Sequence, residues 1–590
     1  MAHQIKKGLG AVVHGNATEF RVWAPFAQSV ELIGEAGQRV QQQLTSENDG
    51  YWSIEIDGAK PGQNYRFVIN TPDGRRLEKN DPYARQLTDS DIGWSVIVDN
   101  EFDWEDITFT PPAKEKQIIY ELHVGTFNRP DASTPGTFYT AIEKLDYLQN
   151  LGITMIELMP VSSMATSNGW GYAPNHIFSV ENAYGGRYGL LTFVKECHKR
   201  GIGVILDVVY NHFSQNTDLW QFDGWSENGR GGIYFYNDER GDTPWGGRPD
   251  YGRSEVRQFI LDNVTMWMTE YRMDGLRVDS TIFMRNKAGA NDDPYNDIGE
   301  AWSLLSDITT LVRKINPHAI TIAEDISANS HIVKSTSDGG TGFDAQWELG
   351  FPYVLRDALG VTSSQSQARL DGIDFELKRT YNGNAFERVV FSDSHDTAAN
   401  GSSRLNEVIT PGNAESVMSR KSEILANAVM LTSPGIPMLL QGEEFMQQGA
   451  FNDWQMLEWH KTEQFAGIVL AHQHLINLRL NSFGDTAGLT GQSVSLFHRD
   501  DTNNVIAYHR WQNGGPGDDT IVVVNFDKSN FDSYRLGLPI AGEWRVRFNS
   551  SWNGYSPDFA NLGVETVTTD DTQQVTLPIA GQSVIILSQD

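Results

Sequence analysis

The stretch "GLRVDS" (275–280) decides how the rest of this 590-residue sequence is interpreted. It is an apolar run that follows a helical pattern, and it carries an arginine and an aspartate two positions apart. Alternate residues of a strand point to the same side, so Arg277 and Asp279 are expected to project together. The sequence on either side decides whether this charged pair is structural or chemical.

Similar apolar runs recur along the chain. They are segments 117–126, 153–161, 203–212, 319–326, 387–396 and 436–445. Helical patterns separate most of them, for example over 189–200 and 254–271. Continuous apolar strands that alternate with helices indicate a parallel sheet covered on both faces. About eight such units predict an α/β fold, a (β/α)8 TIM barrel, over residues 111–485.

The two ends of the chain show a different pattern. Residues 1–110 and 486–590 contain short alternating strands separated by Gly, Asp, Asn and Pro turns, which predict a β-sandwich on each side of the barrel. Residues 213–252, between the third barrel strand and the next helix, have no clear period. Their large aromatic residues are Trp220, Trp225, Tyr234, Tyr236 and Trp245. Long loops are functional or disordered, and this aromatic content favours a small subdomain leaning over the barrel rim.

The composition limits the partners that the protein can have. Acidic residues outnumber basic ones by 76 to 46, which gives a formal charge of −30. So negative a surface repels nucleic acids and anionic membranes, and it favours a neutral ligand. The single cysteine, Cys197, excludes an intramolecular disulfide and suits a reducing compartment. Without a signal-peptide pattern or a membrane-spanning apolar run, we expect a cytoplasmic protein, as a monomer or small homo-oligomer.

Three carboxylates at predicted strand ends are the main chemical signal: Asp279, Glu324 and Asp396. Retaining cleavage of a glycosidic bond needs one carboxylate as nucleophile and a second as proton donor and acceptor. A neighbouring cation such as Arg277 lowers the pKa of a nucleophile and keeps it ionised. The second carboxyl must instead hold its proton near neutral pH. Any one of these acids fits a helix cap or a salt bridge at the rim as well as it fits catalysis. The presence of all three at matching strand ends favours catalysis.

Other candidates have two interpretations. In "DVVYNH" (207–212), Asp207 fits a strand cap and His212 fits a core histidine, as well as parts of a site. In "NGWGYAPNH" (168–176), Trp170 and Tyr172 fit core packing as well as a wall on which a pyranose ring stacks.

Several features are interpreted as structural. His472 and His474 lie two apart on a helix and therefore do not face each other. "DGGTGF" (338–343) lacks the lysine of a phosphate loop. "NDDPYND" (291–297) lacks the spacing of a calcium loop, and Cys197 is expected to be a packing residue.

Four ordered segments together resemble the α-amylase superfamily, glycoside hydrolase family thirteen. They are "DVVYNH" (207–212), "GLRVDS" (275–280), "IAEDIS" (322–327) and "FSDSHD" (391–396). By this resemblance Asp279 is the nucleophile that forms a glycosyl ester, Glu324 is the general acid/base, and Asp396 is the third acid, which grips sugar hydroxyls. The positions that contact the reacting sugar or support the site are Arg277, His212, His395, Tyr172, Trp170 and Asp207.

The likeness extends to the ends of the chain and to two groups within the superfamily. "FRVWAPFAQSVELIGE" (20–35) resembles the sandwich, a carbohydrate-binding type of module, that precedes the barrel in branching enzymes, isoamylases and maltooligosyltrehalose trehalohydrolases. "YELHVGTF" (120–127) is similar to trehalohydrolases, whereas "EVRQFILDN" (255–263) is similar to branching enzymes. Asp393 and Thr397 depart from the glutamate and glutamine usual in branching enzymes.

The resemblance implies a retaining enzyme that acts on a neutral α-glucan, closest to the 1,4-α-glucan branching enzymes. Such an enzyme cleaves α-1,4 linkages and forms α-1,6 linkages through a glycosyl ester, here on Asp279. The alternatives are a hydrolase of the same superfamily (a maltooligosyltrehalose trehalohydrolase or an α-amylase), which uses water as the acceptor, and an inactive glucan-binding protein. The chemistry needs no organic cofactor, and no ligand set for a structural calcium ion can be read from the sequence.

Overall fold

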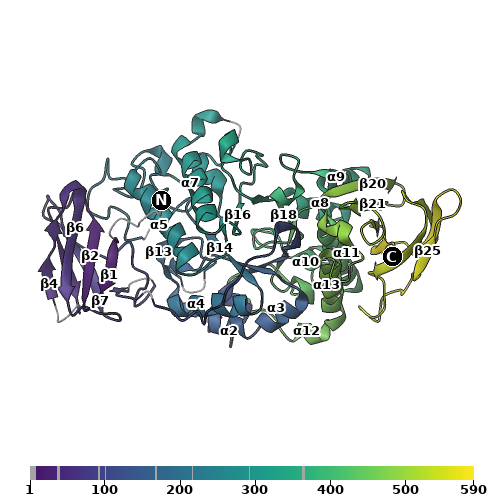
Figure 1. Ribbon diagram of the computed structural model, residues 1–590, viewed down its shortest axis with the longest axis horizontal. Coiled ribbons are helices and arrows are strands. Elements are labelled where there is room, and N and C mark those ends of the chain that lie inside the picture. Colours follow the sequence, from purple (N-terminus) through teal and green to yellow (C-terminus); the bar gives the residue numbers. More distant parts are fainter. Residues whose placement is uncertain are drawn as a thin grey trace.

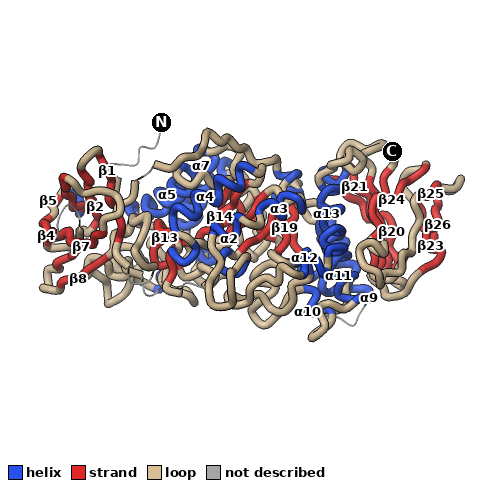
Figure 2. The backbone as a smooth tube through the Cα atoms, turned by 90° about the horizontal axis from the view of Figure 1, so that it is seen from below, coloured by secondary structure: helices blue, strands red, loops and turns tan. Residues whose placement is uncertain are grey.

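The molecule is elongated, with a β-rich domain at each end of a central barrel domain (Figure 1). The structure, a computed structural model, describes residues 8–35, 40–90, 93–99, 101–166, 169–214, 217–290, 293–361 and 366–590. Seen from below, the three domains lie in a row, and most of the helices belong to the middle one (Figure 2). Within the described ranges, no helix has the length and apolar character that crossing a membrane requires.

The central domain is a closed barrel of eight parallel strands, which confirms the predicted (β/α)8 fold. In order around the barrel they are β10 (Ile119–Leu122), β11 (Met155–Leu158), β14 (Gly203–Val208), β15 (Gly275–Val278), β16 (Ile320–Ala323), β17 (Ala345–Trp347), β18 (Arg388–Phe391) and β19 (Ile436–Leu440). Every residue in them is buried, which explains why seven of the eight appear as continuous apolar runs. The sequence did not reveal β17, because it has three residues and follows a glycine-rich turn.

Helices surround the barrel. The longer ones are α4 (Gly186–Lys199), α5 (Ser254–Thr269), α7 (Gly299–Ile315), α8 (Gly350–Ala358), α9 (Ser366–Lys378), α11 (Val417–Thr432) and α13 (Ala466–Arg479). The shorter ones are α1 (Val124–Phe127), α2 (Phe138–Ile142), α3 (Leu145–Leu151), α6 (Thr281–Arg285), α10 (Leu405–Ile409) and α12 (Lys461–Gln464). In α7, for example, Ala301, Leu304, Leu305, Ile308 and Val312 form the buried stripe. Their spacing of three and four residues is that of a helix with one apolar face.

Both terminal domains consist of antiparallel sheets, as predicted. The N-terminal domain has two sheets. One consists of β1 (Gly10–His14), β2 (Ala17–Trp23), β6 (Tyr51–Asp57) and β5 (Thr45–Ser46). The other consists of β4 (Val40–Gln43), β3 (Ser29–Gly34), β7 (Asn64–Asn70), β8 (Arg76–Lys79) and β9 (Ser95–Val96). The C-terminal domain also has two sheets. The larger consists of β20 (Ser493–Asp500), β21 (Val505–Trp511), β22 (Thr520–Asn525), β27 (Ser583–Ser588), β24 (Glu543–Asn549) and β25 (Thr566–Thr568). The smaller pairs β23 (Phe531–Gly537) with β26 (Gln574–Ile579). A hairpin of β12 (Ser162–Met164) and β13 (Pro174–Val180) follows the second barrel strand.

The aromatic loop of residues 213–252, of which 215 and 216 are outside the described residues, joins the N-terminal sandwich to the barrel. Trp225 stacks on Phe26 of the sandwich, with ring centroids 4.5 Å apart. The carboxylate of Asp223 accepts the backbone N–H of Phe26 at 2.9 Å and that of Trp225 at 3.1 Å. At its other end the loop reaches the barrel mouth, where Trp245 lies 5.5 Å from the ring of His212. The loop therefore connects two domains as well as approaching the rim.

Replacing Asp223 with alanine is expected to loosen the N-terminal sandwich. Asp223 is fully buried, so its removal leaves two backbone N–H groups without an acceptor, at a cost of about 1–3 kcal/mol. Denaturant unfolding followed by tryptophan fluorescence should show an earlier first transition. Asp57→Ala, at an exposed aspartate of β6, is the control and should stay within about 0.5 kcal/mol of the parent. Equal transitions in the two variants would contradict this account.

Candidate active site

The barrel strands carry polar residues where they end. Asp207 lies in β14, Asp279 follows β15 directly, Glu324 follows β16 directly, and His395 and Asp396 lie just beyond β18. Parallel barrel strands present their C-terminal ends on one face, where barrel enzymes hold their chemistry. The structure brings these candidates together at that face of the barrel.

The guanidinium of Arg277 lies at the centre of this group. It is fully buried, and its Nη1 donates to Asp207 Oδ2 at 2.5 Å and to Asp279 Oδ1 at 2.9 Å. Its Nη2 lies 3.0 Å from Glu324 Oε2. The ring of Trp347 covers the guanidinium at 4.3 Å. One buried cation therefore contacts three carboxyl groups. The charged pair of "GLRVDS" is part of a cluster that also includes Asp207 and Glu324.

The Asp279 side chain is fixed by its neighbours. Asn211 Nδ2 donates to Asp279 Oδ2 at 2.6 Å and to the Asp279 carbonyl at 3.0 Å. The next residue, Ser280, has a left-handed backbone with φ 42° and ψ 54°, which is uncommon for a residue other than glycine. Its backbone N–H donates to Glu324 Oε2 at 2.9 Å. This turn ties together the two strand ends that carry Asp279 and Glu324.

Glu324 holds a proton at neutral pH. Burial raises the pKa of Glu324 to about 8, and the charges of Asp279 and Asp396 add to this rise while Arg277 opposes it. A carboxyl group with such a pKa can give its proton to a leaving group and take one back later.

The sequence predicted that Arg277 lowers the pKa of Asp279 and so keeps it ionised. Arg277 does lower this pKa, but the overall shift is upward, so the prediction of a lowered pKa is wrong. Burial raises the pKa of Asp279 more than Arg277 lowers it, and the charge of Asp207 raises it further. The sequence did not show how completely this rim is desolvated. Asp279 nevertheless accepts hydrogen bonds from Arg277 and Asn211, which stabilise its charged form.

His395 is a second cation at the rim. Burial lowers its pKa, but the charges of Asp396 and Glu121 outweigh this effect and raise the pKa to about 9. Nδ1 lies 2.5 Å from Glu121 Oε1, and Nε2 lies 3.6 Å from Asp396 Oδ1. Asp396 is the most open of the three acids, with 38% of its side chain exposed. The carboxylate of Asp396 therefore lies on the open side of the site, and the buried His395 ring lies directly behind it.

Aromatic and neutral groups complete the rim. Tyr172 donates its hydroxyl to Asp207 Oδ2 at 2.6 Å and stacks on His395 with centroids 5.1 Å apart. Trp170 packs edge-on against His395 at 5.7 Å. Burial lowers the pKa of His212 to about 4, so its ring is neutral. Its Nδ1 lies 2.5 Å from Asn211 Oδ1, and its buried Nε2 has no hydrogen-bond partner within the described ranges.

The remaining motifs have structural partners. Asp393 is buried, and its two oxygens accept from Arg356 Nη2 at 2.5 Å and from the backbone N–H of Leu405 at 2.7 Å. His472 Nδ1 lies 2.9 Å from the carbonyl of Ile468, and Cys197 is buried. In the part of the chain that the structure describes, no group of three or more His, Cys, Asp or Glu residues is arranged to hold a metal ion.

Sequence reasoning missed three residues of this site: Asn211, Glu121 and Trp347. Asn211 stands inside "DVVYNH", but nothing in the pattern distinguished it from the residues beside it. Glu121 is an acid within an apolar strand, which is a signal of the same kind as Arg277. Trp347 belongs to β17, the strand without a sequence pattern.

A closed barrel whose rim holds two carboxyl groups on a shared arginine is the arrangement expected of a glycosidase-type enzyme. The family models identify it further. Residues 121–245 and 247–475 match the α-amylase catalytic domain, residues 8–84 match carbohydrate-binding module 48 (isoamylase N-terminal domain), and residues 497–590 match the α-amylase C-terminal all-β domain. The chain belongs to the α-amylase family.

The similar sequences include branching enzymes and a trehalohydrolase. The 1,4-alpha-glucan branching enzyme of Corynebacterium jeikeium is 31% identical, over 93% of this chain and 78% of that protein. That of Rhodospirillum rubrum is 30% identical, over 97% and 80%. The malto-oligosyltrehalose trehalohydrolase of Saccharolobus solfataricus is 30% identical, over 73% and 74%. Among solved structures, a pullulanase of Paenibacillus barengoltzii shares the fold, with a TM-score of 0.78, 21% identity and coverage of 99% and 94%.

The rate of α-glucan cleavage is expected to fall as the pH rises through about 8. The folded-state pKa of Glu324 is raised to about 8, so its proton is present below that pH and lost above it. Without the proton, kcat/KM should fall about tenfold per pH unit. A pH–rate profile measures this, and Glu324→Gln should lower the rate by about 10²–10⁴-fold and remove the basic limb. A basic limb that is unchanged in Glu324→Gln would contradict the assignment.

Proposed function

We propose that this protein acts on α-1,4-glucans with retention of configuration, as a 1,4-α-glucan branching enzyme. The observation that supports the chemistry is the carboxyl pair on Arg277, in which Glu324 holds the proton and Asp279 is stabilised as a carboxylate. Double displacement at a glycosidic bond requires one carboxyl group in each of these two states.

In the first step, the Asp279 carboxylate attacks the anomeric carbon of an α-1,4 linkage while Glu324 gives its proton to the departing glycosidic oxygen. A β-glycosyl ester of Asp279 and a shortened glucan result. In the second step, the 6-hydroxyl of another glucan chain gives its proton to Glu324 and attacks the same carbon. The ester bond to Asp279 breaks, an α-1,6 linkage forms, and both carboxyl groups return to their starting states.

The side chains around the pair bind the sugar at the scissile bond. We assign the Nε2–H of His395 and the carboxylate of Asp396 to sugar hydroxyls, supported by the exposure of Asp396 and by the 3.6 Å between its Oδ1 and His395 Nε2. The Nε2 of neutral His212 accepts a further hydroxyl. Tyr172 and Trp170 supply flat surfaces for a pyranose ring.

We assign three parts to the chain. Residues 1–110 form a glucan-binding module, supported by the match of residues 8–84 to carbohydrate-binding module 48. Residues 111–485 form the catalytic barrel, which includes the aromatic loop of residues 213–252. Residues 486–590 form the C-terminal sandwich. A module that binds glucan beside the barrel raises the local concentration of a polymeric substrate.

Hydrolysis is the second candidate, because water can replace the 6-hydroxyl without any change in the catalytic residues. The trehalohydrolase relative, at 30% identity, favours this alternative. Branching is preferred because the branching-enzyme relatives align with 93% and 97% of this chain, compared with 73% for the trehalohydrolase.

Incubation with amylose distinguishes the two reactions. Branching should lower iodine staining and create α-1,6 linkages, detected by NMR, with little increase in reducing ends. Asp279→Asn, which removes the nucleophile at nearly constant size, is the control and should abolish both changes. A steep increase in reducing ends would contradict branching and favour hydrolysis, and trehalose release from maltooligosyl-trehalose would favour the trehalohydrolase.

A further inference from the structure

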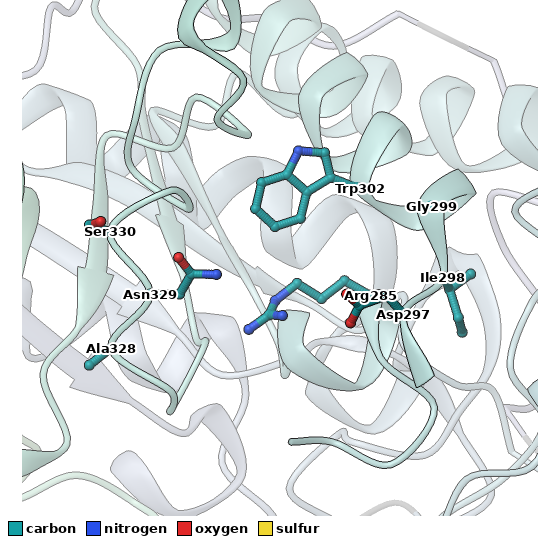
Figure 3. A pocket seen from close by; sticks show the side chains of 8 residues that line it. All are labelled: Arg285, Asp297, Ile298, Gly299, Trp302, Ala328, Asn329 and Ser330. Carbon is teal, nitrogen blue, oxygen red and sulfur yellow. The ribbon is translucent and has the colours of Figure 1, made fainter. Parts of the chain in front are cut away.

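A second pocket opens on the catalytic face, outside the carboxyl cluster. It has a volume of about 630 Å³, within the usual range for small-molecule sites. Its walls are the end of α6, the start of α7 and the loop that follows β16. The lining residues are Arg285, Asp297, Ile298, Gly299, Trp302, Ala328, Asn329 and Ser330 (Figure 3). None of them belongs to the catalytic machinery described above.

The side chains in this pocket combine an aromatic ring with hydrogen-bonding groups. The guanidinium of Arg285 and the amide of Asn329 point toward each other across the pocket, and the indole of Trp302 lies above them (Figure 3). Asn329 Oδ1 accepts the backbone N–H of His331 at 3.0 Å, which leaves Nδ2 to face the pocket. Asp297, on the other wall, is exposed and supplies an acceptor. A ring surface bordered by donors and acceptors suits a sugar.

The charge of the pocket favours a neutral ligand. Arg285 is buried, and its Nε and Nη2 donate to the two oxygens of Asp325 at 2.8 and 2.7 Å. This bidentate pairing neutralises the guanidinium while holding it rigidly at the pocket wall. The other charged group of the lining, Asp297, is negative, and the whole protein carries a formal charge of −30. Phosphate and other anions are therefore poorly matched to this pocket.

The pocket is connected to the catalytic centre through the chain. α6 begins two residues after Asp279 and ends at Arg285, and the loop from Glu324 leads to Asn329. A smaller pocket of about 240 Å³ shares Asp297 and Ile298 with it and is lined also by Tyr295, whose side chain is 92% exposed. The two pockets adjoin at Asp297 and Ile298, and each has an aromatic residue in its lining, Trp302 in one and Tyr295 in the other.

From this geometry we infer a second carbohydrate site, in which the pocket around Trp302 and Asn329 holds a segment of an α-1,4-glucan chain outside the catalytic cleft. The inference rests on the proposed function for the identity of the sugar. A chain held there remains on the face where Asp279 and Glu324 act, so the site raises the affinity for long glucans more than for short ones.

Fluorine NMR of protein labelled with 5-fluorotryptophan tests the inference. Asp279→Asn protein is titrated with maltoheptaose so that the ligand is not consumed. Trp302→Phe identifies the resonance of Trp302, and phenylalanine variants of Trp245 and Trp552 identify two references. Trp245 lies beside His212 near the catalytic rim, and Trp552 is exposed in the C-terminal domain. The Trp302 resonance is expected to shift with saturation, while that of Trp552 stays in place.

A blocking variant provides a test that leaves the pocket walls intact. A Cβ added at Gly299 meets no atom within 4 Å, so Gly299→Gln extends a side chain into open space at the pocket without strain. It should weaken the saturation measured at Trp302 by about tenfold. Gly299→Ala is the matched control and should keep the parent affinity, because one methyl group leaves the pocket open.

The outcomes separate this inference from the proposed function. A shift at Trp245 without one at Trp302 would overturn the second site and leave the catalytic assignment standing. The absence of a shift at both residues would contradict the second site and α-glucan binding alike. A shift at Trp302 on addition of inorganic phosphate, or an unchanged affinity in Gly299→Gln, would also overturn the inference.

Discussion

The burial of Arg277 among three carboxyl groups is the interaction on which the active site depends. A buried charge is tolerated only when it is paired, and the guanidinium meets Asp207, Asp279 and Glu324 at 2.5–3.0 Å. The positive charge of the guanidinium also reduces the repulsion between these acids, which is strong because the rim is shielded from water. Losing the arginine would leave buried carboxyls unpaired, so the same contact supports both the stability of the barrel mouth and its chemistry.

The register of neighbouring barrel strands brings Arg277 and the carboxyl groups together. Asp207 and Arg277 are paired residues of neighbouring strands, and Val278 is paired with Ala323, so the residues that follow them, Asp279 and Glu324, leave the sheet side by side. The left-handed turn at Ser280 then aims a backbone N–H at Glu324. Burial raises the pKa of both acids, and different donors oppose the rise: the Asn211 amide at Asp279 and the Ser280 backbone N–H at Glu324.

The sequence predicted the barrel and its three acids because buried parallel strands give long apolar runs in which a charged residue is conspicuous. It did not reveal β17, since three residues after a glycine-rich turn carry no period, and it therefore missed Trp347 over the guanidinium. It also gave the wrong net shift for the pKa of Asp279. Spacing showed the cation two residues away, but the degree of burial depends on the neighbouring strands β14 and β16 and on Trp347, which no local pattern encodes.

In the proposed mechanism Asp279, held by Arg277, forms the glycosyl ester. Trapping tests it directly. An α-glucosyl fluoride with a second fluorine at C5 forms the ester through a good leaving group, while the added fluorine slows the second step. Peptide mass spectrometry of the trapped protein should find the sugar on Asp279. An adduct on Asp396 or Glu324 instead, with Asp279 unmodified, would contradict the account.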